Sequence, residues 1–266
     1  MTMAQAQYHY KVVSADSQEL DNCLLIDKID SSMSYHIGRP LVVRADKQNR
    51  TLRYAHGGAS LDKLTLSMEL DYQRFLPAFT TIFEGVYHMN SRNFYHLDIK
   101  LANITMQKDY TFRFIDFGIS GKNVPRVIFC NVYVIWPYET CLLAKDPPSP
   151  AEGADRLSRY TNDSYFLYYS RDFPQANLAQ AISDNYHRLK AMAYTERNRL
   201  IYSKLDVYSL GIVLDGVIRL LRMPPALKEA LQTLKLSMTD IRTAKRCTPL
   251  QALQRYRTIV NSIKNT

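Results

Sequence analysis

Two short segments decide the fold: Tyr95-His96-Leu97-Asp98-Ile99-Lys100-Leu101-Ala102-Asn103 and Phe114-Ile115-Asp116-Phe117-Gly118. Together they read H-x-D-x-K-x-x-N and then D-F-G, with Asp116 eighteen positions after Asp98. One interpretation is a strand–turn–strand hairpin in which Asp98, Asn103 and Asp116 serve only the turns. Turn chemistry does not require Lys100 or a second aspartate at this distance, so the pattern favours a reactive site over a plain hairpin.

The pattern resembles, in both order and spacing, the catalytic and metal-binding loops of eukaryotic-type protein kinases. In phosphoryl transfer the protein mainly places the nucleophile and neutralises charge on the phosphates. The resemblance implies that Asp98 accepts the proton of the attacking hydroxyl and that Lys100 stabilises charge on the transferred group. It also implies that Asn103 and Asp116 hold Mg²⁺, which prefers hard oxygen ligands, together with ATP.

Segments further along the chain carry the same resemblance. Trp136-Pro137-Tyr138-Glu139 is similar to the kinase A-P-E element, and Arg246 matches the arginine that pairs with its glutamate. Lys204–Leu214 is similar to the start of a kinase helix, in which Asp206 would accept hydrogen bonds from backbone amides of the catalytic loop. An ordinary helix N-terminal aspartate, favoured by the helix dipole, is the alternative for Asp206.

Apolar periodicity supplies the expected secondary structure around these motifs. Apolar residues recur at near-helical spacing from Leu76 to Met89, which predicts the helix that leads into the catalytic loop. Phe112, Phe114 and Ile115 predict a short buried strand before Asp116.

The N-terminal region is where the resemblance weakens. The first glycine is Gly38, so no G-x-G-x-x-G loop lies upstream to cover the ATP phosphates. Tyr8–Val13 reads as a strand whose Lys11 would, by resemblance, contact the α- and β-phosphates. A solvent-facing strand lysine is the alternative.

Glu19 is the expected ion-pair partner of Lys11. It lies on a predicted helix from about residue 17 to residue 29. The alternative is that Asp16-x-x-Glu19 is only a helix capping box.

These features predict an α+β, bilobal protein-kinase-like fold with a reduced N-lobe and a mainly helical C-lobe. We expect a single domain over residues 1–266, with the N-lobe at about 8–54, the hinge at 55–61 and the C-lobe at 62–266. An insertion at about 140–203 contains a predicted helix over 174–190. A compact N-lobe, a Gly-Gly after the hinge, the W-P-x-E variant and this insertion look most like divergent kinase-like proteins of large DNA viruses.

Composition agrees with an intracellular enzyme. The chain has 266 residues, 46% of them hydrophobic, and neither a signal-like N-terminus nor a membrane span is apparent. We expect a cytoplasmic protein or, if viral, one of the host cell or virion. Four scattered cysteines predict reduced thiols. The net charge of +9 is assigned to a solvated surface, so no specific nucleic acid is predicted, and the oligomeric state is left open.

Two main function classes follow. An active serine/threonine protein kinase would use ATP, Mg²⁺ and a protein substrate. A pseudokinase would keep the fold as a binding or scaffold module, and the missing glycine loop is its best support. A small-molecule phosphotransferase is a third option, but Lys100, Asp206 and Glu139 favour protein substrates.

Regulation is predicted from Leu97, which stands where many kinases carry an arginine that gathers a phosphate. Because leucine cannot bind a phosphate, we expect the segment from Asp116 to Glu139 to be ordered without phosphorylation. The apolar stretch over residues 127–135 is predicted to hold it by burial.

Overall fold

The computed structural model describes residues 8–13, 18–31, 42–46, 51–55, 58–64, 70–121, 136–143 and 175–263. Its strands are β1 (Tyr8–Val12), β2 (Val42–Asp46), β3 (Thr51–Ala55), β4 (Ala59–Ser60), β5 (Ile104–Met106) and β6 (Phe112–Phe114). Its α-helices are α1 (Glu19–Ser31), α2 (Tyr72–Ser91), α5 (Gln175–Ala191), α6 (Tyr194–Leu220), α7 (Pro225–Met238) and α8 (Pro249–Ile263). The 3-10 helices within the described residues are η1 (Leu61–Lys63), η2 (Leu101–Asn103) and η4 (Tyr138–Leu143).

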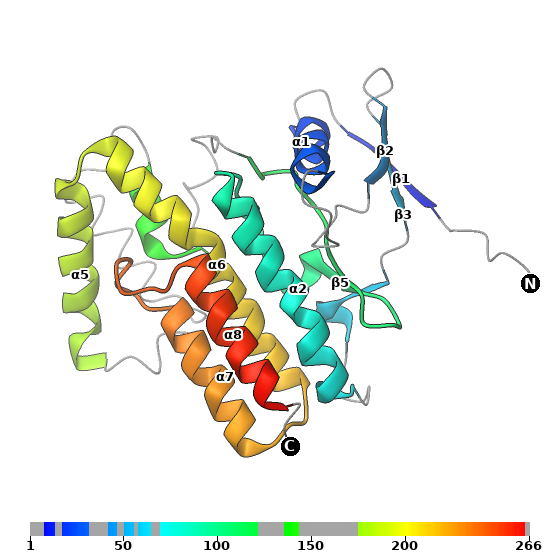
Figure 1. Cartoon of the computed structure of the whole chain (residues 1–266). Coiled ribbons are helices and arrows are strands. Elements are labelled where there is room, and N and C mark those ends of the chain that lie inside the picture. The colour runs from blue at the N-terminus through cyan, green and yellow to red at the C-terminus, as the bar shows by residue number, and fades with distance from the viewer. Residues whose placement is uncertain are drawn as a thin grey trace, which may run out of the picture.

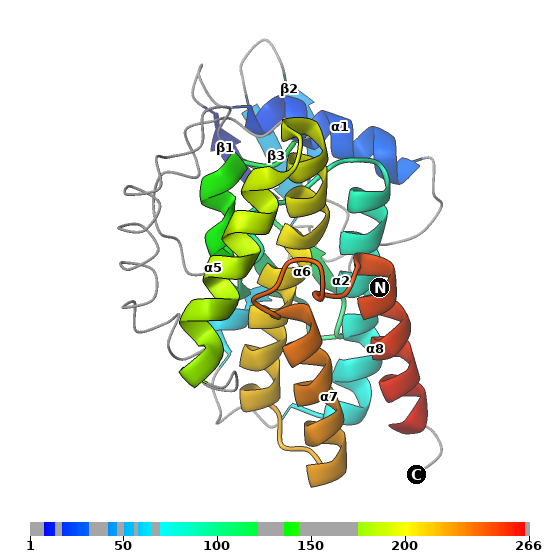
Figure 2. The same ribbon diagram turned by 90° about the vertical axis from the view of Figure 1, so that its left-hand side faces the viewer.

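Within these residues the strands form two antiparallel sheets of three strands, in the orders β1-β3-β2 and β4-β5-β6. The first sheet lies with α1 at one end of the molecule, and α2 and α5–α8 make up most of the rest (Figures 1 and 2). A fold of mixed helix and small sheets that is mostly helical is therefore confirmed. The division into two lobes, the hinge and the domain bounds stay predictions.

Position 58, just before β4, has no room for a side chain and is occupied by glycine. Its φ is +84°, and a Cβ there would lie 1.9 Å from the carbonyl oxygen of Met106. β4 pairs with β5 through Ala59 opposite Met106. Glycine at position 58 thus lets the chain from the first sheet pass close enough to join the second.

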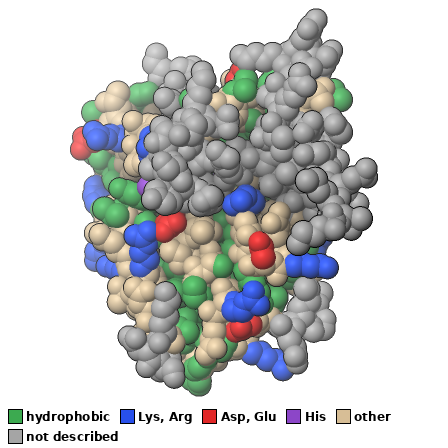
Figure 3. All heavy atoms as spheres, turned by 45° about the vertical axis from the view of Figure 1, so that its right-hand side comes forward, with side chains coloured by type: hydrophobic (Ala, Val, Ile, Leu, Met, Phe, Trp, Pro, Cys, Tyr) green, Lys and Arg blue, Asp and Glu red, His purple; other side chains and the backbone are tan. Residues whose placement is uncertain are grey.

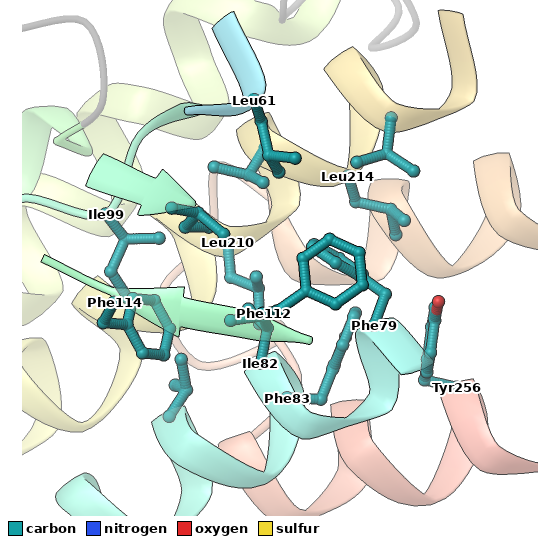
Figure 4. Packing of buried hydrophobic residues seen from close by; sticks show 14 of the residues in the cluster. Leu61, Phe79, Ile82, Phe83, Ile99, Phe112, Phe114, Leu210, Leu214 and Tyr256 are labelled. Atoms are coloured by element: carbon teal, nitrogen blue, oxygen red, sulfur yellow. The ribbon is translucent and has the colours of Figure 1, made fainter. Parts of the chain in front are cut away.

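The main core forms between α2, α8 and β6. As expected from the sequence, α2 buries one face, and its residues Phe75, Leu76, Phe79, Ile82, Phe83, Val86 and Met89 are buried. The ring of Phe83 stacks on that of Tyr256 from α8 at 4.1 Å, and the Tyr256 hydroxyl donates a hydrogen bond to the Leu76 carbonyl (2.9 Å). Figure 4 shows Phe112 packed among the α2 side chains. This packing fixes α2 and β6, which flank the catalytic loop in sequence.

Helix α6 is the central helix of the chain, and its start corrects the expectation. The helix was expected to begin near Lys204, but it begins at Tyr194, so Asp206 lies within it. No proline or glycine occurs between Tyr194 and Asp206 to stop the helix. Residues 204–215 are buried all round, as a helix in the middle of a core requires. The ordinary helix-start interpretation of Asp206 is therefore wrong.

The insertion is partly described. Its predicted helix is confirmed as α5, which lies beside α6 in the view of Figure 2. The apolar stretch at 127–135, which was predicted to be buried, lies outside the described residues.

The charged surface is mixed. On the face shown in Figure 3, the described Lys and Arg side chains are scattered among polar, acidic and apolar ones. Among the described helices, none combines the length and the apolar character that a membrane span requires.

An ion pair expected from the sequence is confirmed between Glu139 of η4 and Arg246, which lies between α7 and α8. Arg246 Nη1 lies 2.6 Å from Glu139 Oε1, and both side chains are fully buried. Two more guanidinium nitrogens of Arg246 donate to the Asp240 carbonyl. Because both charges are desolvated, the pair holds η4 in position more than it adds net stability.

We predict that Arg246→Met lowers the free energy of unfolding by about 3–5 kcal/mol, because Glu139 is left as an unpaired buried charge. Arg257→Met is the matched control, since Arg257 pairs with Glu84 at the surface and should contribute less than about 1 kcal/mol. Urea unfolding followed by circular dichroism measures both. Equal losses in the two variants would contradict the assigned role.

Candidate active site

The carboxylate of Asp98 is the centre of the site. It is 8% exposed, and its Oδ2 accepts hydrogen bonds from Lys100 Nζ (2.8 Å) and Asn103 Nδ2 (2.7 Å). Asn103 Nδ2 also donates to the Asp98 backbone carbonyl (2.9 Å). Asp98 Oδ1 is buried and has no hydrogen-bond partner among the described residues. One oxygen is therefore fixed in place, while the other keeps unused capacity to accept a hydrogen bond.

Asp206 holds the loop that carries Asp98. From α6, its Oδ2 accepts from the His96 amide (2.9 Å) and from Asn90 Nδ2 of α2 (3.0 Å), and its Oδ1 accepts from the Leu97 amide (2.9 Å). The expected hydrogen bonds from loop amides to the Asp206 carboxylate are thus confirmed. Burial raises the pKa of Asp206, and the donated hydrogen bonds oppose that rise.

The side chain of His96, which belongs to the same loop, is completely buried. Its ring lies 4.7 Å from that of Phe117 and 5.2 Å from that of Phe114, and its Nδ1 accepts a hydrogen bond from the Asp98 amide (3.3 Å). Burial lowers the pKa of His96, so the imidazole is neutral at pH 7. With Nδ1 acting as acceptor, its proton resides on Nε2.

Asp116 reaches the site from the D-F-G turn. Its φ is +63°, a left-handed conformation, and its side chain is 45% exposed. The Ile115 amide donates to the Asn103 carbonyl (3.0 Å), which ties the turn to the loop. Asn103 and Asp116 therefore come from adjoining backbone segments, as the sequence predicts.

Lys11 and Glu19 meet at the same turn. Lys11 Nζ lies 2.6 Å from Glu19 Oε2 and 3.9 Å from Asp116 Oδ1. The expected Lys11–Glu19 ion pair is present, and a purely solvent-facing Lys11 does not describe this geometry. Asp16, the other half of the alternative capping box, lies outside the described residues.

Sequence reasoning missed Asn22. Its Nδ2 donates to the Phe117 carbonyl (2.9 Å), so α1 is bonded directly to the D-F-G turn. The signal was its position three residues after Glu19, which places both on one face of the helix. α1 thereby supplies both a charge partner for Lys11 and an anchor for the turn.

The donor set fits magnesium. Asn103 turns its amide nitrogen toward Asp98, so its carbonyl oxygen is the atom left for a cation, and Asp116 adds a part-exposed carboxylate. These are hard oxygen ligands, and Mg²⁺ is commonly bound by one or two protein groups plus phosphates. Among the described residues, no group of three or more His, Cys, Asp or Glu side chains gathers as a metal cage.

Part of the chain is similar to known protein kinases. A protein kinase domain family model matches residues 29–135, which include Asp98, Lys100, Asn103 and Asp116. The serine/threonine-protein kinase ppk11 of Schizosaccharomyces pombe is 33% identical over 72 residues, which cover 27% of this chain and 23% of that protein. Both matches support the eukaryotic-type protein kinase superfamily. The chain matches less than a quarter of the length of this curated kinase.

Kinase similarity and geometry coincide over the loop and the D-F-G turn. Lys11 and Glu19 precede the matched residues, so their assignment rests on the ion pair and its position beside Asp116.

The neutral state of His96 predicts a pH-dependent stability. The unfolded chain takes up a proton at a pKa of about 6.5 and the folded chain does not, so stability falls as pH drops below that value. The slope contributed by this group reaches about 1.4 kcal/mol per pH unit. We expect the free energy of unfolding to depend less steeply on pH between 7 and 5.5 in His96→Asn. The side-chain amide oxygen of asparagine can replace Nδ1 as the acceptor of the hydrogen bond from the Asp98 amide. Urea unfolding at several pH values measures it, and parallel curves for both proteins would contradict it.

Proposed function

We propose that this chain is an ATP-dependent serine/threonine protein kinase. The single observation that carries the proposal is the Asp98 carboxylate, which has Oδ2 fixed by Lys100 and Asn103 and Oδ1 buried with no hydrogen-bond partner among the described residues. A carboxylate in this state is suited to orient a hydroxyl and accept its proton.

The chain's own residues divide the work of transfer. The hydroxyl of a serine or threonine donates a hydrogen bond to Asp98 Oδ1 and passes its proton there as its oxygen bonds to the γ-phosphorus of ATP. The bond between that phosphorus and the β,γ-bridging oxygen breaks at the same time, and ADP leaves with the bridging oxygen. Lys100, 2.8 Å from Asp98 Oδ2, provides positive charge beside the transferred group. Asn103 and Asp116 would hold Mg²⁺, which when bound neutralises charge on the phosphates.

The nucleotide is anchored from the other side of the site. Lys11 is half exposed and its Nζ lies 3.9 Å from Asp116 Oδ1, so its ammonium lies beside a residue that would hold Mg²⁺ and is placed to contact the phosphates of ATP. Glu19, nearly buried, holds Lys11 in that position.

Protein hydroxyls are proposed as substrates on two grounds. Lys100 follows Asp98 at the spacing that resembles serine/threonine kinases, and the curated relative is named as such a kinase. The use of ATP and Mg²⁺ accords with an intracellular location. The narrower placement among viral kinase-like proteins rests on the compact N-terminal region, the Gly-Gly pair, the W-P-x-E variant and the insertion, and it stays a prediction.

A second candidate is a pseudokinase that serves as a binding or scaffold module. The observation in its favour is that no glycine precedes Gly38, so no glycine-rich loop is present in this sequence to cover the phosphates. Nucleotide binding without any transfer in the assays below would favour this candidate.

The metal assignment predicts the effect of Asp116→Asn. The substitution replaces a carboxylate ligand by an amide of equal size, so Mg²⁺-dependent transfer should be abolished while the fold is kept. Radiolabel transfer from ATP to a generic basic protein measures it, with circular dichroism as the folding check. Asp109→Asn is the control, because Asp109 is an exposed turn residue near the site in sequence. Undiminished transfer by pure Asp116→Asn protein would refute the assignment.

The anchoring pair predicts a graded loss of ATP affinity. Lys11→Met removes a charge-assisted contact of about 1.5–3 kcal/mol, which corresponds to roughly ten- to hundredfold weaker binding. Glu19→Gln should weaken binding less, because Lys11 itself remains. Titration calorimetry with ATP and Mg²⁺ measures both variants against Lys63→Met, which changes an exposed lysine of η1. Unchanged affinity in Lys11→Met would place the anchoring cation elsewhere.

A further inference from the structure

Trp136 bonds directly to the catalytic loop. Its Nε1 donates a hydrogen bond to the Leu97 carbonyl oxygen (2.6 Å), and the two side chains are 5% and 0% exposed. Both pack in one buried cluster with Leu205 and Tyr208 of α6. Trp136 lies twenty positions after Asp116, so the contact joins two segments separated by the residues that follow D-F-G.

The contact acts on the peptide unit that precedes Asp98. The Leu97 carbonyl and the Asp98 amide belong to one planar peptide group. Trp136 holds the carbonyl end, and His96 Nδ1 holds the amide end (3.3 Å). Fixing both ends of this plane fixes the direction in which the Asp98 Cα and its carboxylate leave the loop.

This peptide unit needs to be held. Leu97 has a φ of +66°, a left-handed conformation that is unfavourable for a residue with a side chain. Asp206 fixes the Leu97 amide, which belongs to the preceding peptide group. That hydrogen bond does not by itself restrain rotation about ψ of Leu97, which sets the direction of the Leu97 carbonyl. The Trp136 indole is the described group that bonds to this carbonyl.

Trp136 is itself fixed from the other side. Three residues later, Glu139 forms the fully buried pair with Arg246, and the amide and hydroxyl of Thr140 both donate to the Pro137 carbonyl. The indole is therefore attached to a rigid turn, and the position of that turn is transmitted to Leu97.

We propose that Trp136 is a positioning residue for phosphoryl transfer, and that its indole N–H orients Asp98 by holding the Leu97 carbonyl. The inference rests on the proposed kinase function. Leu97 has no positive charge with which to bind a phosphate. The Trp136 indole restrains the Leu97 carbonyl instead, so the loop is held without phosphorylation.

The activity test separates this role from ordinary packing. Trp136→Phe keeps an aromatic ring but loses the N–H, and Leu189→Ala perturbs the same cluster from α5 without altering a hydrogen-bonding side chain. We expect Trp136→Phe to lower kcat by roughly tenfold or more, since small misplacement of a reacting group has effects of that size. KM for ATP should change less than about twofold, because ground-state binding is untouched. A kcat equal to that of Leu189→Ala would overturn the proposal.

A second measurement does not depend on activity. In the wild type the Asp98 amide proton should exchange slowly with solvent, and Trp136→Phe should accelerate its exchange by roughly five- to thirtyfold, as expected for about 1–2 kcal/mol. The buried Leu210 amide of α6 serves as the reference for global unfolding. Unchanged exchange at Asp98 relative to Leu210 would overturn the positioning role. A wild type that lacks transfer but shows the expected exchange would refute the kinase function alone.

A shape-preserving replacement covers the case in which Trp136→Phe does not fold. Trp136 is the one tryptophan of the chain, so benzothienylalanine, which has sulfur in place of the ring N–H, can be incorporated at this residue alone. It should reproduce the loss of kcat and the faster Asp98 exchange. Wild-type values for both would overturn the proposal.

Discussion

The buried carboxylate of Asp206 is the constraint on which the rest of the site depends. It accepts three hydrogen bonds, two from successive amides of the catalytic loop and one from Asn90 of α2. Without these donors, a charge in the centre of the core would be strongly unfavourable. The loop must therefore keep the conformation that presents both amides, and this places Leu97 in its left-handed conformation. Asp98 follows directly, so α6 sets the position of the reacting carboxylate.

The parts of the site differ in how firmly they are held. Asp98 and Asn103 are almost buried and bonded to each other, whereas Lys11 and Asp116 are about half exposed. The side proposed to accept the proton is thus preorganised by the core. The side proposed to bind the phosphates depends on α1, which reaches the D-F-G turn through the Glu19–Lys11 pair and through Asn22. We infer that nucleotide affinity is governed by the placement of α1, and the rate of transfer by the core beneath Asp98.

Short motifs with fixed spacing, and the contacts that the kinase resemblance implies, were predictable from the sequence, whereas side-chain hydrogen bonds to distant backbone carbonyls were not. The loop, the D-F-G turn, α2 and the Glu139–Arg246 pair were expected because each depends on a local pattern or a specific resemblance. The start of α6 was misplaced by ten residues, since nothing local distinguishes a helix that begins at Tyr194 from one that begins near Lys204. Asn22 and Trp136 bond to backbone carbonyls far along the chain. Every residue has a backbone carbonyl, so a hydrogen bond to one leaves no characteristic residue type in the sequence from which the contact could be predicted.

The proposed mechanism requires Asp98 to accept the proton of the attacking hydroxyl. Single-turnover transfer from radiolabelled ATP to a protein acceptor, with the chain in excess, tests this for the wild type and for Asp98→Asn. An amide keeps the shape but cannot take the proton, so we expect a rate roughly 10²–10⁴-fold lower with unchanged ATP affinity. A rate in Asp98→Asn equal to that of an active wild type, or a wild type that binds ATP and Mg²⁺ yet transfers nothing, would contradict it.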